Sequence, residues 1–345
     1  MMSDLKINNI TNRTGNGGPV IAGVSTVSST GSFIVPVGST EMRGGRGRGI
    51  IAGGITPSVQ NTIGYITIAT TGNSTDFGDL VADRLAGAAM ASSTRGIFAG
   101  GADASDADTT VIQYVTISSE GGSSNFGDLQ QERGYVGGAS NDIRGLIFGG
   151  AIVPGYTGLN SIEYITIATT GDASNFGDLT TAHYITSACA SSTRGVRAGG
   201  SPAPVNVIDY VTIATLGDAI DFGDYLTPIT GSAGVSSPTR GVFGPCNFGS
   251  SPTITNTIGY ITIASTGNAL DFGDATIARD AISSVCSTVR GVFAGGRTGP
   301  PAAEALKNAM DYITIASTGN ALDFGDLDVA KRYTMGCSDA HGGLG

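Results

Sequence analysis

The sequence predicts an all-β fold in which one four-stranded unit is repeated six times. Three short patterns recur in the same order: Arg-Gly followed by apolar residues, a Tyr in "YITI" or "YVTI", and a Phe in "DFGD" or "NFGD". Successive Arg-Gly copies stand 46 to 50 residues apart, and the segments 260–275 and 312–327 are nearly identical. No part of a unit sustains the 3.6-residue period of an amphipathic helix, so the repeat favours strands.

Each unit is expected to contain four short strands, and the sixth copy shows them in order. A small, apolar strand over 280–287 comes first, and a second strand over 290–296 ends in Gly-Gly, which permits positive φ in a turn. The third strand, 311–317, alternates with a period of two. The fourth strand, 321–327, follows a Thr-Gly-Asn turn.

The repeated strands are predicted to be covered on both faces. In the third strand Tyr312 and Thr314 lie on one face and Ile313 and Ile315 on the other, so both faces are expected to be uncharged. A sheet with one face in water would alternate apolar with charged side chains. Radially packed sheets hide both faces against their neighbours, and a four-stranded repeat of about 50 residues is typical of a propeller. The sequence therefore predicts a six-bladed β-propeller.

The phase of the repeat predicts how the ring closes. No convincing first strand precedes Arg48, whereas residues 328–345 align with 276–293 and then stop. We expect this C-terminal segment to supply the innermost strand of the blade that begins at Arg48, which leaves no open sheet edge. The propeller is accordingly assigned to residues 48–345. Residues 1–47 lie outside the repeat and are predicted to be an extended N-terminal attachment segment that another chain orders.

The three repeated side chains are predicted to hold the blades together. Each Arg is expected to pair either with the Asp that follows Phe-Gly or with backbone carbonyls between blades, although a ring of arginines could also grip an anion. A residue that recurs in all six blades favours the structural role. The positions are Arg48, Arg95, Arg144, Arg194, Arg240, Arg290, Tyr65, Tyr114, Tyr164, Tyr210, Tyr260, Tyr312, Phe77, Phe126, Phe176, Phe222, Phe272 and Phe324.

Composition argues against several classes of partner. The net charge is −10 and only 18 residues are Lys or Arg, which disfavours nucleic acid and anionic membrane surfaces. No apolar run reaches the length of a membrane-spanning helix. The four cysteines include no CxxC pair and are expected to be buried free thiols. The two histidines have no ligand partners at metal-site spacing, so no metal or other cofactor is predicted.

The repeat resembles a kelch-type unit, with Gly-Gly after the second strand and a Tyr-bearing third strand. It departs from that pattern where Phe of "DFGDL" stands in the place of a Trp. The N-terminal "INNITNRTGNGGPVIAGVSTVSSTG" together with units such as "IDYVTIATLGDAIDFGDY" is similar to virion structural proteins of tailed bacteriophages, particularly those of cyanobacterial hosts. The resemblance implies a tail-fibre, neck or capsid-decorating component that is located in the virion and docks on other virion proteins through residues 1–47.

Three functions remain open, and the first is a non-enzymatic phage structural protein that displays its propeller, with host-surface glycan as a further partner. It would form a homo-oligomer or be present in many copies in an assembly. The second is a glycan-binding adhesive module outside any virion. The third is a propeller glycoside hydrolase, because "STDFGDL" at 74–80 loosely matches the sialidase Asp-box. No catalytic residues are assigned, since the chain lacks a recognisable nucleophile and acid at irregular positions.

Variable loops on a repeated scaffold are the expected place of function. The connections after the second strands differ most in length and composition. Gly155, Tyr156 and Thr157 are predicted to form a binding loop. Asp103, Asp106 and Asp108 share another loop, which lacks the ligand spacing of a calcium site and is expected to be solvated.

Overall fold

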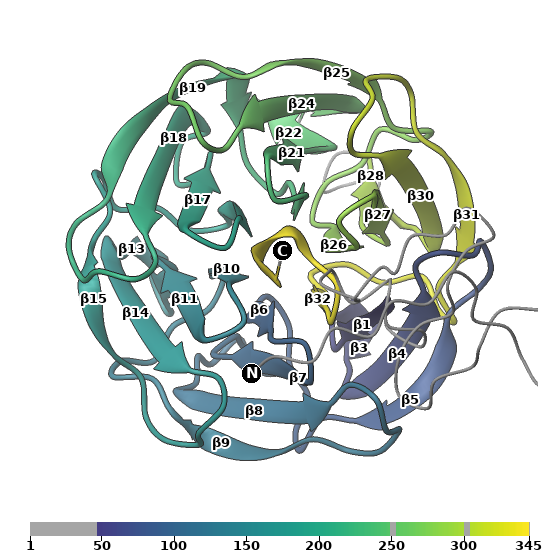
Figure 1. Cartoon of the computed structure of the whole chain (residues 1–345). Helices are drawn as coiled ribbons and strands as arrows, with labels where there is room; N and C mark the ends of the chain where they lie inside the picture. Colours follow the sequence, from purple (N-terminus) through teal and green to yellow (C-terminus); the bar gives the residue numbers. More distant parts are fainter. Residues whose placement is uncertain (1–46, 249–252, 300–303, 345) are drawn as a thin grey trace, which may run out of the picture.

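A computed structural model of the chain describes residues 47–248, 253–299 and 304–344. They form a ring of six four-stranded antiparallel sheets, which confirms the predicted six-bladed all-β propeller (Figure 1). The predicted attachment segment, 1–47, lies outside the described residues except for Gly47. Within those described ranges, no helix is long and apolar enough to cross a membrane.

The two inner strands of each sheet are short and almost completely buried. Blade 1 consists of β32, β1, β4 and β5, and blades 2 to 6 follow in chain order. The innermost strands are β32 (Met335–Ser338), β6 (Ala88–Ala91), β10 (Gly137–Ser140), β16 (Ser187–Ala190), β20 (Gly234–Ser236) and β26 (Ser283–Cys286). The second strands are β1 (Arg48–Ala52), β7 (Arg95–Ala99), β11 (Arg144–Phe148), β17 (Arg194–Ala198), β21 (Arg240–Phe243) and β27 (Arg290–Ala294).

The two outer strands carry the Tyr and Phe of the repeat. The third strands are β4 (Thr62–Thr67), β8 (Val111–Thr116), β14 (Ser161–Thr166), β18 (Val205–Thr212), β24 (Thr257–Thr262) and β30 (Ala309–Thr314). The fourth are β5 (Thr75–Asp79), β9 (Ser124–Asp128), β15 (Ser174–Asp178), β19 (Ile220–Ile229), β25 (Leu270–Asp274) and β31 (Leu322–Asp326). Period-two alternation, turns and glycines therefore locate the strands to within a few residues of the expected ranges.

The C-terminal strand closes the ring at blade 1. β32 pairs with β1 in antiparallel register from Gly49 opposite Ser338 to Ala52 opposite Met335. Just beyond β32, Asp339 Oδ1 accepts hydrogen bonds from the backbone N–H groups of Gly47 at 2.8 Å and Arg48 at 2.9 Å. The beginning and the end of the propeller are thus joined by a strand pair and by one carboxylate.

The apolar cores of the molecule lie at the seams between blades. At the seam of blades 2 and 3, Phe126 and Ile97 of blade 2 pack with Ile165 and Ile167 of blade 3 in one buried cluster. Equivalent clusters fill the other five seams. Each sheet buries its faces only against its neighbours, so no blade has a separate core.

Three blades contain a buried ion pair that the sequence analysis missed. The residue before the repeated Tyr is Glu163, Asp209 or Asp311 in blades 3, 4 and 6, so the expectation that the third strand carries no charge is wrong there. Each carboxylate meets a buried Arg, with N–O distances of 2.6 Å for Arg197–Asp209 and 3.0 Å for Arg279–Asp311. The third pair is Arg133–Glu163. A buried charge needs such a partner because solvation is lost.

The wall of the channel alternates between glycine and slightly larger residues. One equivalent position of each innermost strand lines the channel, and its residues around the ring are Gly336, Ala89, Gly138, Ala188, Gly234 and Ser284. A Cβ placed on any of the three glycines would lie 2.3–2.6 Å from the carbonyl oxygen of the preceding blade. The backbones of blades 2 and 3, 4 and 5, and 6 and 1 therefore approach too closely for a side chain.

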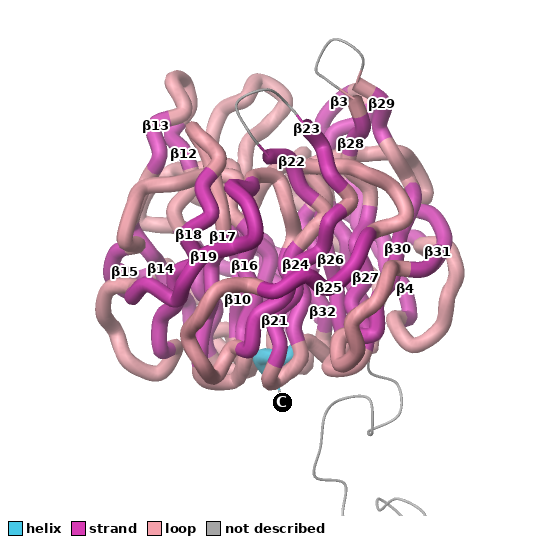
Figure 2. The backbone as a smooth tube through the Cα atoms, turned by 90° about the horizontal axis from the view of Figure 1, so that it is seen from above, coloured by secondary structure: helices cyan, strands magenta, loops and turns pink. Residues whose placement is uncertain are grey.

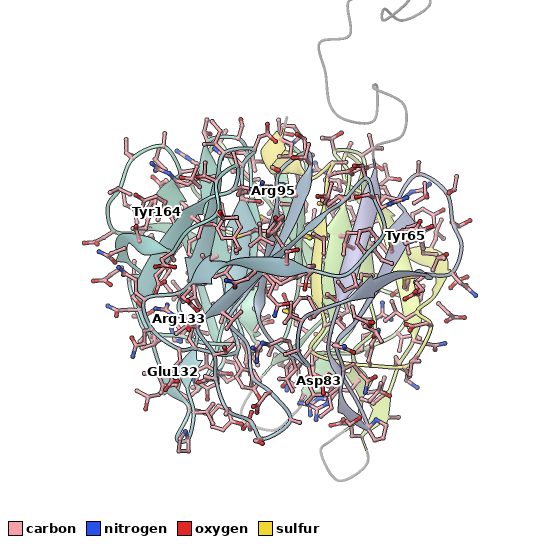
Figure 3. All side chains as sticks on the ribbon, turned by 90° about the horizontal axis from the view of Figure 1, so that it is seen from below. Tyr65, Asp83, Arg95, Glu132, Arg133 and Tyr164 are labelled. Atoms are coloured by element: carbon pink, nitrogen blue, oxygen red, sulfur yellow. The ribbon has the colours of Figure 1, made fainter. Side chains whose placement is uncertain are left out.

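The two ends of the ring differ (Figure 2). Four two-stranded hairpins stand at one end, which we call the hairpin end, and Figure 3 shows Asp83 and Glu132 toward it. Gly47 and the short 3₁₀ helix η3 (Gly342–Leu344) lie at the opposite, closed end. The hairpin strands are β2 (Ile55–Thr56), β3 (Ser58–Val59), β12 (Ala151–Ile152), β13 (Thr157–Gly158), β22 (Cys246–Phe248), β23 (Thr253–Thr255), β28 (Arg297–Thr298) and β29 (Ala305–Leu306).

Removal of residues 331–345 is expected to open the ring. The truncation exposes one edge of β1 and the channel-side faces of blades 2 and 6, and it removes the fully packed Met335. We expect the free energy of unfolding to fall by more than about 3 kcal/mol, since loss of one buried Met side chain alone costs a few kcal/mol. Chemical denaturation followed by circular dichroism measures this. A chain that ends at His341 keeps β32 and should lose much less; equal losses would contradict closure by this strand.

Removal of one member of a buried ion pair should cost more than removal of both. Arg197→Met leaves the Asp209 carboxyl group buried without its Arg partner, with an expected cost of about 3–5 kcal/mol. Arg197→Met combined with Asp209→Leu removes both charges and should restore a large part of that loss. Denaturation midpoints of the two variants test this, and a double variant no more stable than the single one would contradict a penalty for leaving the Asp209 carboxyl group unpaired.

Candidate functional site

The six repeated Arg, Tyr and Phe side chains form one stack in each blade. The Arg guanidinium carbon lies 4.3–4.9 Å from the Tyr ring centre, and the Tyr and Phe rings meet edge to face at 5.8–6.1 Å. Such contacts add cation–π and aromatic attraction to the burial of the Phe ring. Figure 3 shows Arg95, Tyr65 and Tyr164 in the half of the ring nearer the closed end.

Each repeated Arg also binds the neighbouring blade. Its Nη1 donates to the carbonyl of the Ile that follows the next third strand, at 2.7–3.0 Å, as in Arg144 to Ile213. Of the two partners that the sequence left open, the structure thus shows the backbone carbonyl and not the Asp after Phe-Gly. The six guanidinium groups are distributed over six separate seams, so they do not converge on one ligand.

The glycine of the Phe-Gly-Asp motif serves as a second inter-blade contact. Gly78 has a φ of 145°, and a Cβ there would lie 2.5 Å from the backbone of Gly121 in the next blade. Gly121 N–H donates to the carbonyl of Phe77 at 2.8 Å, and all six seams repeat this bond. The segment that resembles a sialidase Asp-box therefore makes backbone contacts between adjacent blades.

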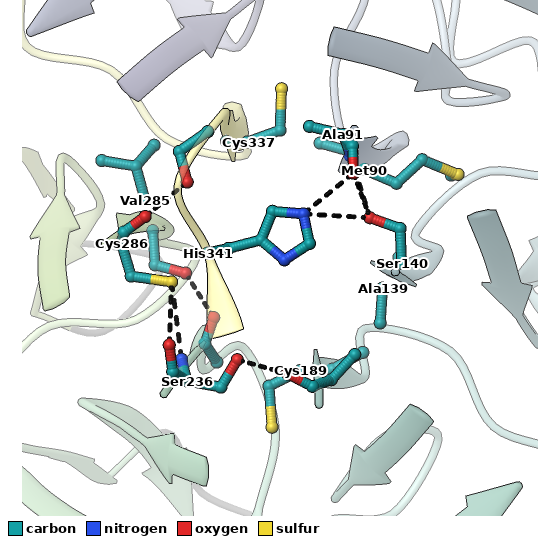
Figure 4. Close-up of a pocket in the computed structure, with 18 residues that line it drawn as sticks. Met90, Ala91, Ala139, Ser140, Cys189, Ser236, Val285, Cys286, Cys337 and His341 are labelled. Atoms are coloured by element: carbon teal, nitrogen blue, oxygen red, sulfur yellow. Dashed lines mark hydrogen bonds between the residues drawn. The ribbon is translucent and has the colours of Figure 1, made fainter. Parts of the chain in front are cut away.

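The closed end of the channel contains His341 (Figure 4). Its Nε2 lies 2.8 Å from the carbonyl of Ala91 and 3.3 Å from Ser140 Oγ. Its Nδ1 accepts from Gly343 N–H at 3.2 Å, which places the proton on Nε2. Burial lowers the pKa of His341. The imidazole thus fastens η3 across the channel.

The four cysteines are buried and form no disulfide within the described residues, as expected from the sequence. Cys189, Cys286 and Cys337 line the closed end of the channel. Burial raises the pKa of the Cys337 thiol to about 12, so it is protonated at neutral pH.

The hairpin end of the channel carries a cluster of four tyrosines, which we call the tyrosine cluster: Tyr135, Tyr156, Tyr184 and Tyr333. Tyr135 is central, with its ring 5.5 Å from those of Tyr156 and Tyr333 and 6.5 Å from that of Tyr184. Burial raises the pKa of Tyr135, so its phenol remains a hydrogen-bond donor at neutral pH. The cluster joins blades 1, 3 and 4 around the mouth of the channel.

Backbone geometry holds this mouth open. A residue two or three positions before each innermost strand has a φ of 52–68°, and these residues are Ala86, Tyr135, Ile185, Gly231, Ala281 and Tyr333. Backbone hydrogen bonds of 2.8–3.4 Å connect these segments from blade to blade into a closed circle. Tyr135 and Tyr333 of the tyrosine cluster belong to this circle, so hydrogen bonds fix the backbone positions of both residues.

The acidic loop of blade 2 is partly exposed, as expected, but two of its carboxylates also bind the hairpin of blade 3. Asp106 accepts from the hydroxyl of Tyr156 at 2.5 Å and that of Tyr135 at 3.2 Å. Asp108 Oδ2 accepts from Val153 N–H at 2.7 Å. Burial raises the pKa of Asp108 to about 6. Asp103 instead closes its own loop by accepting from Ser105 and Ala107 N–H.

The predicted binding loop lies beside this cluster, but only one of its residues takes part. Tyr156 is 40% exposed and its hydroxyl binds Asp106. Gly155 faces open space, and Thr157 begins β13. Sequence reasoning missed Tyr135, Tyr184 and Tyr333. A usable signal was present, because only five of the 11 tyrosines lie outside the repeated anchor position and four of those five form this cluster.

Neither a metal-binding group of residues nor a match to a known protein points to a further site. Within residues 47–248, 253–299 and 304–344, no three His, Cys, Asp or Glu side chains are grouped as a metal ion would require. His183 is buried elsewhere, with Nδ1 3.1 Å from the carbonyl of Ser201. No known family model matches the chain, and no curated protein matches its sequence.

Asp108→Asn is expected to make stability less dependent on pH. The folded carboxyl has its pKa raised to about 6, above the ordinary value of about 3.9, so folding favours its protonated form. Its ionisation therefore destabilises the fold as pH rises from about 4 through 6. The Asn variant keeps an acceptor for Val153 N–H, and its stability relative to wild type should be greater at pH 7 than at pH 4. Thermal unfolding at the two pH values measures the difference.

Asp103→Asn is the matched control from the same loop. Hydrogen bonds from Ala107 and Ser105 lower the pKa of Asp103, so its charge stabilises the fold and is lost as pH falls. Its stability relative to wild type should therefore be lower at pH 7 than at acid pH. The same sign for both variants would contradict the assigned environment of Asp108.

Proposed function

We propose that this protein is a non-enzymatic structural component of a tailed-phage particle. It would dock through the segment 1–47 and display a kelch-like propeller in multiple copies. The observation that carries the proposal is the polarity of the ring. The described chain begins at Gly47 beside Asp339 at the closed end, whereas all described hairpins and the tyrosine cluster lie at the other end.

This polarity fits a display module because attachment and recognition would use opposite ends. A chain that joins a particle at Gly47 would present the hairpin end outward. The repeated stacks make all six seams alike, while the hairpins differ in length and sequence from blade to blade. Loops on a rigid scaffold are the usual place of binding specificity.

An adhesive module outside any particle is the second candidate. The observation that favours it is the partly exposed tyrosine cluster, because aromatic side chains supply large contact area at little entropic cost. Both candidates assign recognition to the hairpin end. They differ in whether residues 1–47 attach to a particle.

Antibody labelling of intact particles tests the proposal with the full-length chain. Antibodies raised against a peptide from residues 1–46 and against the loop around Tyr156 are applied before and after particles are dissociated. We expect the loop to be labelled on intact particles and the N-terminal segment only after dissociation, with labelling located by electron microscopy.

The loop antibody also supplies the control, since it must bind the purified chain. Absence of the chain from purified particles, shown by mass spectrometry, would remove the virion role and leave the adhesive module. Labelling of residues 1–46 on intact particles while the loop is hidden would reverse the proposed orientation.

A further inference from the structure

We propose that a hollow beside the tyrosine cluster binds a single neutral pyranose ring. The hollow has a volume of about 210 Å³ and lies between blades 1, 2 and 3 at the hairpin end. Ile55 and Val59 of the first hairpin and Leu85 of blade 2 form its apolar side. The inference deepens the proposed function and rests on its assignment of recognition to the hairpin end.

Aromatic rings form one wall of the hollow. Tyr135 and Tyr333 line it directly, with ring centres 5.5 Å apart and planes nearly perpendicular at 88°. Tyr156 packs on the outer side of Tyr135 and extends the aromatic surface toward solvent. The C–H face of a sugar ring is apolar and packs well on such rings, while its hydroxyl groups remain free to bind polar side chains.

Polar groups of both kinds face the aromatic wall. Arg332 lines the hollow, its guanidinium lies 4.9 Å from the Tyr333 ring centre, and its Nε pairs with Glu304 at 2.8 Å. Its two terminal nitrogens make no hydrogen bond within the described part of the chain, so their donors remain available. Asp106 and Asp103 supply acceptors, because a carboxylate has about four lone-pair sites and each uses two.

This combination matches the chemistry of a polyol. Each sugar hydroxyl both donates and accepts, so neighbouring hydroxyls can bridge a carboxylate and a guanidinium. The Arg332 guanidinium repels a cationic ligand, and the carboxylates of Asp103 and Asp106 repel an anionic ligand. A neutral sugar satisfies all three groups without leaving a charge unpaired.

The size of the hollow limits how much of a glycan enters it. A volume of about 210 Å³ is below the ~300–1,000 Å³ of pockets that enclose drug-sized ligands. One terminal ring therefore fits the hollow, and the rest of a longer glycan would extend over Tyr156.

Backbone strain at the edge of the hollow supports a role beyond the repeat. Among the described residues, seven non-glycine residues have positive φ, and five of them belong to the circle around the channel mouth. The other two are Asp106 and Tyr156, which bind each other and have no counterpart in the other blades. Strained residues that a repeat does not require are concentrated at functional sites.

Saturation-transfer NMR with the full-length chain tests the inference. The probes are the methyl glycosides of glucose, galactose, mannose and N-acetylglucosamine, with N-acetylneuraminic acid, glucuronic acid and glucosamine as charged comparators. We expect transfer to ring protons of at least one neutral glycoside and weaker transfer to all three charged sugars. Arg332→Met and Asp106→Asn should each raise Kd about tenfold or more, the usual effect of losing a hydrogen bond to a charged group.

Glu132→Gln is the matched control, because this exposed carboxylate lies at the same end but outside the hollow. It should leave the Kd unchanged, and all variants should keep the wild-type unfolding midpoint within a few degrees. A lack of transfer to every neutral glycoside, stronger binding of a charged sugar, or equal Kd values in all variants would overturn the inference. Particle labelling does not depend on sugar binding, so a labelled hairpin end without sugar binding would overturn only this inference.

Discussion

No sheet of this protein has a core of its own, and every other feature follows from that constraint. The apolar faces of each blade are buried only against the next blade, in six seam clusters that include the repeated Phe rings. An open row of such sheets would expose two faces, so the last blade has to pack against the first. The pairing of β32 with β1 and the Asp339 carboxylate at Gly47 provide this closure. The nearly identical segments at 260–275 and 312–327 are copied because each seam requires the same contacts.

The same constraint divides each repeat unit into residues that hold adjacent blades together and connections that are free to vary. Arg, Tyr, Phe and the glycine after Phe make contacts that cross each seam, and those contacts use the guanidinium, the rings and the backbone fully. Side chains that differ between blades are therefore confined to the connections, most of all at the hairpin end. There, residues from blades 1 to 4 meet around the channel mouth, although some of them, such as Tyr135 and Tyr333, are about 200 positions apart in the chain.

Much of this architecture could be predicted from the sequence, because strand number, order and closure are written in the repeat itself. The partner of each repeated Arg could not be chosen, since a carboxylate and a carbonyl suit a guanidinium equally well. The burial of Glu163, Asp209 and Asp311 could not be predicted, because their partners Arg133, Arg197 and Arg279 stand outside the repeated Arg position. Tyr156 could be named from its variable loop. Tyr135 and Tyr333 could not be joined to it, because their meeting depends on the curvature of the ring and on backbone at positive φ.

The alternation of the channel wall has a consequence for how such a ring changes size. Glycine at Gly138, Gly234 and Gly336 allows close approach to the blade before it, and a larger residue stands in each blade between them. This alternation of glycine with a larger residue can continue around the whole ring only if the number of blades is even. Gain or loss of one blade would bring two like members together at a single junction, with either a steric overlap or a gap. Gain or loss of two adjacent blades together, about 100 residues, would instead keep the alternation intact at every junction.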